Sequence, residues 1–137
     1  MTFRAMLSKE ENRMVESSGR QPLMTLGKGK KARQFFWEED DKGITVWVGT
    51  SVSLTLTHKE ASDCLNHFHG RWFPLGADML NPTPGGLGEY LLNLPDISNA
   101  RYACHFAAVL VKQNRLVTRD EGNAIYLKVV WPMEVSS

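Results

Sequence analysis

The sequence predicts an α+β fold, in which an antiparallel sheet carries a packed amphipathic helix and is followed by a helix and a β-hairpin. Apolar and polar residues alternate strictly over residues 44–57, as in a sheet with one buried face. Directly afterwards, residues 57–70 combine a helix-capping signal with an apolar stripe of helical spacing. The last third contains a largely apolar helical segment and then two further alternating segments.

A chain of 137 residues is long enough for one domain with its own core, and we expect residues 1–137 to form a single domain. Hydrophobic residues make up 42% and charged residues 23%, as is usual for globular proteins. The expected organisation is an N-terminal arm or short helix at 1–20, a sheet plus helix at 23–70, a loop at 71–88 and a helix–helix–hairpin unit at 86–131.

The alternating segment is best explained as two strands joined by a loop at residues 49–51. This loop places Val48 opposite Val52, so that all the apolar side chains of both strands lie on one face. A two-residue turn would instead place valines opposite serines. One long strand bent at Gly49 is the remaining alternative.

The helix that follows begins with a capping box, in which Thr57 and Glu60 each bond the other's free backbone N–H. Its apolar stripe has the spacing i, i+3, i+4, i+7 and consists of Ala61, Cys64, Leu65 and Phe68. Gly70 stands where the helix should end.

Two earlier strands are expected at 23–26 and 33–38. A turn at residues 40–43 places Trp37 opposite Val46 on the buried face and Phe36 opposite Trp47 on the other face. An aromatic pair among hydroxyl side chains needs a cover, and segment 71–75 is the favoured one. The alternatives are a dimer contact or a ligand platform, with Phe36, Trp47 and Trp72 as the surface residues.

In the last third we expect a short helix at 87–92, a cap at Asp96 or Ser98, a helix over 99–113, and strands at 116–119 and 124–131 around a turn at 120–123. The polar side of the longer helix carries Arg101, His105 and Lys112. This order of elements resembles a winged helix-turn-helix, although no diagnostic motif supports the resemblance.

The net charge is only +1, but no acid occurs between Glu16 and Glu38 or between Asp96 and Asp120. Basic residues of these two segments predict a phosphate-contacting surface with DNA as the partner. Its members are Arg101, His105, Lys112, Arg115 and Arg119, with Lys28, Lys30 and Lys31 in a glycine-containing turn.

A metal site is the third hypothesis, because Cys64, His67, Cys104 and His105 are of the residue types that bind zinc. No Cys-x-x-Cys pair supports it, and buried cysteines commonly serve as small core residues. No catalytic or phosphate-loop motif is present, so we expect neither a bound metal nor a cofactor.

The leading hypothesis is therefore a non-enzymatic nucleic-acid-binding module. The alternative is a small-molecule- or protein-binding domain that acts as a homodimer, and a zinc-dependent enzyme comes third. The absence of a signal sequence, of a membrane-length apolar run and of a cysteine framework predicts a cytoplasmic protein without a membrane partner.

Overall fold

The computed structural model describes residues 19–27, 32–78, 80–122 and 124–130. Its strands are β1 (Gln21–Met24), β2 (Gln34–Glu39), β3 (Gly43–Val48), β4 (Val52–Thr57), β5 (Trp72–Pro74), β6 (Leu116–Glu121) and β7 (Ala124–Val129). Its helices are α1 (His58–Phe68), α2 (Leu87–Leu92), the 3-10 helix η2 (Ala100–Tyr102) and α3 (Ala103–Lys112). The fold is thus α+β, as predicted.

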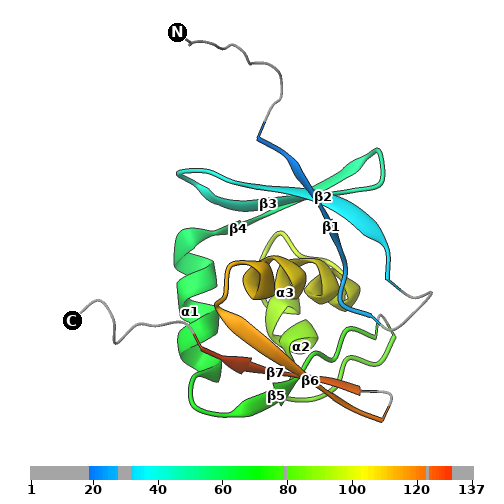
Figure 1. The fold of residues 1–137 in the computed structure, drawn as a ribbon, viewed down its shortest axis with the longest axis vertical. Helices are drawn as coiled ribbons and strands as arrows, with labels where there is room; N and C mark the ends of the chain where they lie inside the picture. The colour runs from blue at the N-terminus through cyan, green and yellow to red at the C-terminus, as the bar shows by residue number, and fades with distance from the viewer. Residues whose placement is uncertain (1–18, 28–31, 79, 123, 131–137) are drawn as a thin grey trace, which may run out of the picture.

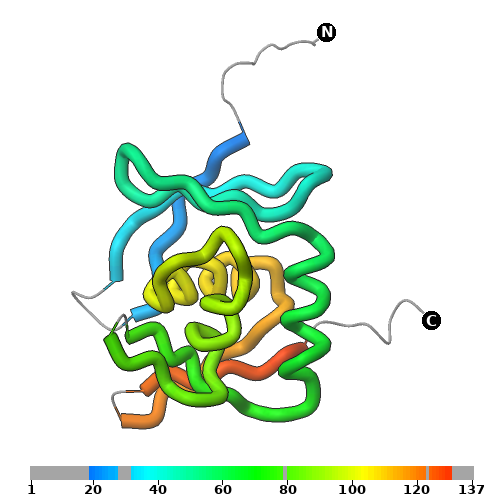
Figure 2. Tube along the Cα trace, turned by 180° about the vertical axis from the view of Figure 1, so that it is seen from behind, coloured from blue at the N-terminus to red at the C-terminus, as the bar shows by residue number. Residues whose placement is uncertain are grey.

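The elements form three layers, with helices between two antiparallel sheets (Figure 1). One sheet, here called the meander, has the order β1-β2-β3-β4, and the other, the small sheet, has the order β5-β7-β6. Helix α3 contacts β1 on one side and β6 on the other, and α1 contacts both sheets. Seen from behind, α1 runs along one side of the molecule while α2 and α3 fill the space between the sheets (Figure 2).

The register of the meander is the one that the alternating pattern predicts. Val48 pairs with Val52, and Trp47 pairs with Phe36. Ile44, Val46 and Leu56 are each 0% exposed on the inner face, so the odd-numbered loop at 49–51 is confirmed. The two earlier strands are present with shifted bounds. Strand β1 covers 21–24 instead of 23–26, and β2 covers 34–39 instead of 33–38.

Helix α1 is also confirmed in detail. The Thr57 hydroxyl accepts from the Glu60 backbone N–H at 3.0 Å, and the Glu60 carboxylate accepts from the Thr57 N–H at 2.9 Å. The whole predicted stripe is buried, and Phe68 stacks on Phe73 of β5 with ring centres 3.9 Å apart. Helix α1 therefore fastens the small sheet to the meander.

The cap of the third helical segment differs from the prediction. The side chain of Asn99 accepts from the Arg101 backbone N–H at 3.0 Å, so neither Asp96 nor Ser98 is the capping residue. Asn99 itself is extended, and helical geometry begins only at Ala100 as a 3-10 turn. Helix α2, by contrast, has the predicted bounds.

The expected cover of the Phe36–Trp47 pair is wrong. Segment 71–75 contributes strand β5, which pairs with β7 in the small sheet and lies on the opposite side of the helical layer (Figure 1). Its Phe73 is 1% exposed and faces the core, and Pro74 is tolerated because β5 is an edge strand. Within the described ranges, no helix is both long and apolar enough to cross a membrane.

Candidate nucleic-acid interface

The basic residues predicted on the polar side of α3 do not form one surface. Arg101 and Lys112 are both exposed, but they lie at opposite ends of the helical segment, roughly 16 Å apart at 1.5 Å per residue. His105, between them, is only 6% exposed, so its place on an exposed stripe is wrong. Lys28, Lys30 and Lys31 lie outside the described residues.

Helix α3 is covered on both sides by the two sheets, and His105 to Leu110 are all buried. A helix that reads the major groove must present a free face to the bases. Helix α2, helix α3 and the β6–β7 hairpin follow one another in the predicted order, but α3 has no exposed face that could enter a groove.

Arg115 is half-buried and belongs to a chain of polar side chains that reaches the surface at Glu39. Its Nη1 donates to Gln113 Oε1 at 3.0 Å, and Gln113 Nε2 donates in turn to Glu39 Oε1 at 3.0 Å. Burial lowers the pKa of the Arg115 guanidinium, although the Glu39 carboxylate acts in the opposite direction. We assign Arg115 to the junction between the meander and the α3–β6 connection.

Arg119 lies against Trp72. Arg119 was predicted as part of the phosphate-contacting surface and Trp72 as part of the ligand or dimer surface. The guanidinium carbon of Arg119 lies 4.3 Å from the centre of the Trp72 ring, and Lys128 Nζ lies 5.9 Å from the same ring. The pairing of β5 with β7 and of β7 with β6 produces this contact, because it places the three side chains on one side of the sheet.

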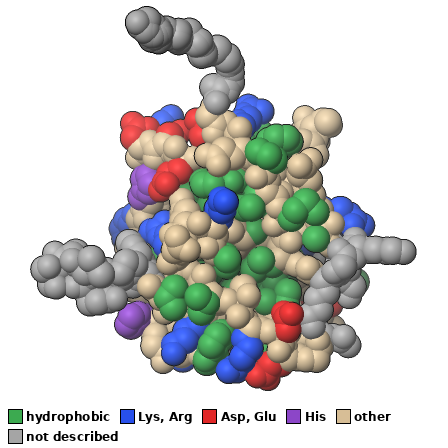
Figure 3. Space-filling view, in the orientation of Figure 1, with side chains coloured by type: hydrophobic (Ala, Val, Ile, Leu, Met, Phe, Trp, Pro, Cys, Tyr) green, Lys and Arg blue, Asp and Glu red, His purple; other side chains and the backbone are tan. Residues whose placement is uncertain are grey.

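We call this outer side of the small sheet the Trp72 face; it consists of Trp72, Val117, Arg119, Tyr126 and Lys128. Along the lower edge of the molecule, basic, hydrophobic and acidic side chains lie side by side over the small sheet (Figure 3). A shallow hollow of about 270 Å³ adjoins Tyr126 between the ends of β5 and β7. Aromatic surface and positive charge thus occur together on this face, where Trp72, Tyr126 and Lys128 are half-buried and Arg119 is exposed.

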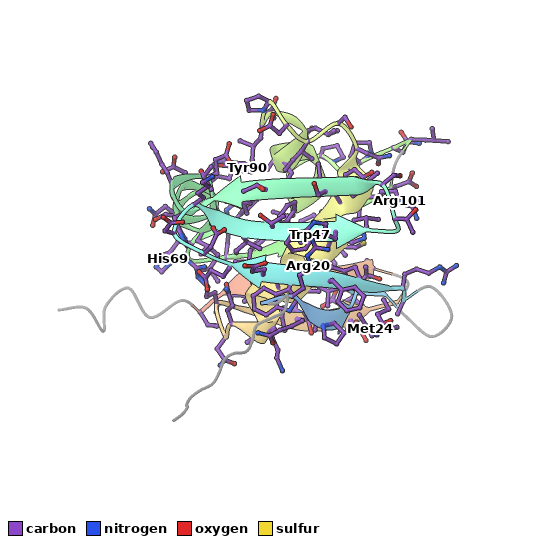
Figure 4. All side chains as sticks on the ribbon, turned by 90° about the horizontal axis from the view of Figure 1, so that it is seen from above. Arg20, Met24, Trp47, His69, Tyr90 and Arg101 are labelled. Atoms are coloured by element: carbon purple, nitrogen blue, oxygen red, sulfur yellow. The ribbon has the colours of Figure 1, made fainter. Side chains whose placement is uncertain are left out.

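The meander also has an aromatic outer face, here called the Trp47 face; it consists of Arg20, Met24, Phe36 and Trp47. The guanidinium carbon of Arg20 lies 3.8 Å from the centre of the Trp47 ring. Trp47 and Arg20 lie near the middle of the sheet in the view onto this face, and Met24 lies toward one edge (Figure 4). Phe36, Trp47 and Trp72, predicted as one surface, are therefore divided between two opposite sheets.

His105 is a neutral core residue. Its ring packs edge-on against Phe35, with the ring centres 4.9 Å apart. The buried Nδ1 atom forms no hydrogen bond with any described residue. Burial lowers the pKa of His105, and the opposing effect of the Arg101 backbone compensates only partly. The uncharged ring can occupy this apolar site, whereas the charged ring is penalised there.

This burial predicts a loss of stability in mild acid. The folded protein resists protonation of His105, whereas the unfolded chain takes up the proton near the ordinary pKa of about 6.5. His105 therefore stabilises the folded protein fully above the unfolded-state pKa. This stabilisation is lost as the pH falls from there through the lowered folded-state pKa. Thermal melts at pH 7.5 and 5.5 should show a larger drop for the wild type than for His105→Leu. An equal drop in both proteins would contradict the assignment.

The cysteine and histidine residues considered as zinc ligands do not converge. Across the described part of the chain, no three His, Cys, Asp or Glu side chains are close enough to hold one ion. Cys64 lies in the apolar stripe of α1, where burial raises the pKa of its thiol to about 12. Its thiol therefore stays protonated and serves as a small core side chain.

No protein-family model matches the chain, and no curated protein or solved structure matches it either. The geometry of the two aromatic faces is therefore what bears on function.

Five residues of these faces were not predicted as surface residues: Arg20, Met24, Val117, Tyr126 and Lys128. The alternation of the last strand places Tyr126 and Lys128 opposite to the buried Leu127, and this signal was available. Arg20 directly precedes β1 and reaches Trp47 of β3 across the one strand between them, β2. No local pattern in the sequence indicates that contact.

Proposed function

We propose that the protein is a non-enzymatic nucleic-acid-binding module that holds a single strand on the Trp72 face. The observation that carries the proposal is the position of Arg119 and Lys128 around the Trp72 ring, at 4.3 and 5.9 Å. Single strands are commonly bound by aromatic side chains that stack on bases and by cations that follow the phosphates. A flat sheet can offer both kinds of contact at once.

A single strand fits this face better than a duplex does. The bases of a duplex are accessible only through its grooves, and these admit a helix, a ribbon or an arm. The described residues offer no exposed helix for this role at the Trp72 face, since α3 is covered by both sheets. The unpaired bases of a single strand can instead stack on Tyr126 or on the Arg119 guanidinium that covers the Trp72 ring.

Two acids lie at this face, and one of them, Asp78, lines the hollow beside Tyr126. Glu121 forms an ion pair with Arg119, in which Arg119 Nε lies 2.9 Å from Glu121 Oε2, and both side chains are about half exposed. Exposed pairs of this kind contribute only about 0–1 kcal/mol. A phosphate can therefore replace the Glu121 carboxylate at small cost, while Lys128, with no ion pair among the described residues, adds a second cation.

The proposal is tested by titrating a labelled single-stranded oligonucleotide with the protein and following fluorescence anisotropy. Trp72→Ala should weaken binding by roughly 5- to 150-fold, the equivalent of about 1–3 kcal/mol for one lost base stack. Arg119→Ala should weaken binding to all sequences alike and reduce the slope of log K against log salt by about 0.7.

Lys59→Ala is the matched control, because it removes one exposed cation from α1, where Lys59 Nζ pairs with Asp63 at 2.9 Å. It changes the net charge as Arg119→Ala does but leaves the Trp72 face intact. If the two variants bind equally well, binding depends only on overall charge and the proposed site is wrong.

We also place this module in the cytoplasm, as part of the same proposal. Both cysteines are free thiols, Cys64 buried and Cys104 half-buried, which supports a reducing compartment.

A further inference from the structure

The Trp47 face repeats the arrangement of the Trp72 face on the opposite side of the molecule. In each case an outward-facing tryptophan on a sheet has an arginine guanidinium stacked on its ring, at 3.8 Å for Arg20 and 4.3 Å for Arg119. The two sheets enclose the helical layer, so their outer faces point in opposite directions (Figure 1).

The Trp47 face has a second aromatic ring beside the first. Phe36 is 42% exposed and lies directly opposite Trp47 on the neighbouring strand. A hollow of about 410 Å³ adjoins them, lined by Arg20, the two rings and residues 49–53. One base can stack on Phe36 and the next on the Arg20 guanidinium that covers Trp47. The hydroxyls of Thr50, Ser51 and Ser53 supply donors and acceptors at the rim of the hollow.

Arg20 supplies a cation for a phosphate. Within the described residues it forms no ion pair and no hydrogen bond, and its guanidinium contacts the Trp47 ring. Stacking occupies the flat face of a guanidinium and leaves its N–H edge free to bind a phosphate.

Acids are confined to one end of the meander. Glu39, Asp40 and Asp41 lie toward the β2–β3 turn, whereas the hollow lies at the β3–β4 turn. Glu38 is the nearest acid: it lies on the outer face two residues from Phe36, and its carboxylate approaches Gly19, next to Arg20. A strand that passes over Phe36 and Trp47 toward residues 49–53 therefore runs away from the negative end.

A second copy of the chain fits this face less well. The meander has three strands of six residues and one of four, so its outer face covers about 350 Å² in projection, and about 700 Å² if the relief of the side chains doubles that area. A stable protein interface needs about 800 Å² from each partner. The face is thus small for a homodimer contact but large enough for a few stacked nucleotides.

We propose that the Trp47 face is a second single-strand site, so that one molecule holds two strands at once and bridges them. This inference rests on the proposed function of the Trp72 face. With a helical layer of about 10 Å and two sheets between them, the sites lie roughly 20 Å apart on opposite sides. A short strand bound to one face cannot reach the other.

The first test is stoichiometry, measured by titration at low salt with an oligonucleotide of about eight thymidines, within the usual length of a single-strand site. The wild type should bind two strands per protein. Arg20→Ala/Trp47→Ala should bind one, Trp72→Ala/Arg119→Ala should bind one, and the combined variant should bind none.

The second test is bridging. Donor- and acceptor-labelled thymidine strands cannot pair with each other, so energy transfer between them at one protein per two strands reports simultaneous binding. We expect transfer with the wild type and its loss with either double variant. Arg20→Gln alone, which keeps both rings, should weaken the second binding event and leave the first unchanged, which separates loss of the site from loss of the fold.

The outcomes distinguish the two proposals. One strand per wild-type protein, lost on changing Trp72 and Arg119, would overturn the bridging inference and leave the proposed function standing. Binding that is lost only on changing Arg20 and Trp47 would overturn the Trp72 site, and no binding by any variant would overturn both. A wild-type dimer in sedimentation that dissociates on Trp47→Ala would show that this face binds a second copy and would also overturn bridging.

Discussion

Replacing Phe68 by alanine should lower the free energy of unfolding by about 3–5 kcal/mol, as for other large aromatic side chains removed from a core. Phe68 is only 1% exposed, at the end of the apolar stripe of α1. Its ring stacks on Phe73 of the small sheet with an angle of 12° between the planes and packs edge-on against Tyr90 of α2 at 5.4 Å. Truncation would leave a cavity where three elements meet, and the neighbouring rings can close it only partly.

Urea unfolding, followed by far-ultraviolet circular dichroism, measures this loss. Phe36→Ala is the matched control, because it removes the same ring from the exposed Trp47 face, where the side chain is 42% exposed. We expect the control to lose well under half of the Phe68→Ala value, since its ring retains much of its contact with water when folded. Equal losses would mean that α1 does not fasten the small sheet to the core.

The meander and α1 could be predicted because their determinants are local. A period of two fixes the buried face of a strand, and an odd-numbered loop is then required to keep Val48 and Val52 on that face. The capping box at Thr57 and Glu60 fixes the start of α1. Each of these signals lies within a few residues of the structure that it specifies.

The small sheet could not be predicted as a sheet. Strand β5 has three residues, one of them Pro74, and such a segment does not differ from a loop in its pattern. Its partner, β7, begins 50 residues after Pro74. Pairing over this distance is determined by the burial of Phe73 and Leu127 in the shared core, to which no local pattern points.

The candidate site was predicted in part for the same reason. Arg119 was predicted as a phosphate-contacting residue and Trp72 as a surface residue, but the contact between them depends on the β5–β7 pairing. The polar side of α3 was misjudged at His105, because a histidine in an apolar helix can be neutral and buried. Charge in a sequence indicates exposure reliably only for side chains that remain charged.

Gly43→Ala should be nearly as damaging as Phe68→Ala, with an expected loss on the order of 3 kcal/mol from backbone strain and overpacking together. Gly43 has φ +152°, which side-chain-bearing residues rarely adopt. A Cβ atom there would meet the Leu56 carbonyl oxygen and lie 2.7 Å from the Thr57 Cα. Both neighbours are backbone atoms, and Thr57 is the N-cap of α1, so relief of the clash would shift the point where the meander leads into the helix.

Gly49→Ala is the control for strain without a clash. Gly49 has φ +65° in the β3–β4 turn, and no atom lies within 4 Å of the position that its Cβ would take. The left-handed conformation alone should cost about 1–2 kcal/mol. Urea unfolding of both variants therefore separates the two contributions, and Gly43→Ala should lose clearly more stability than Gly49→Ala. If both lose the same amount, the close contact of Gly43 with β4 does not exist in solution, and the register of the β3–β4 pair at its Gly43 end would have to be revised.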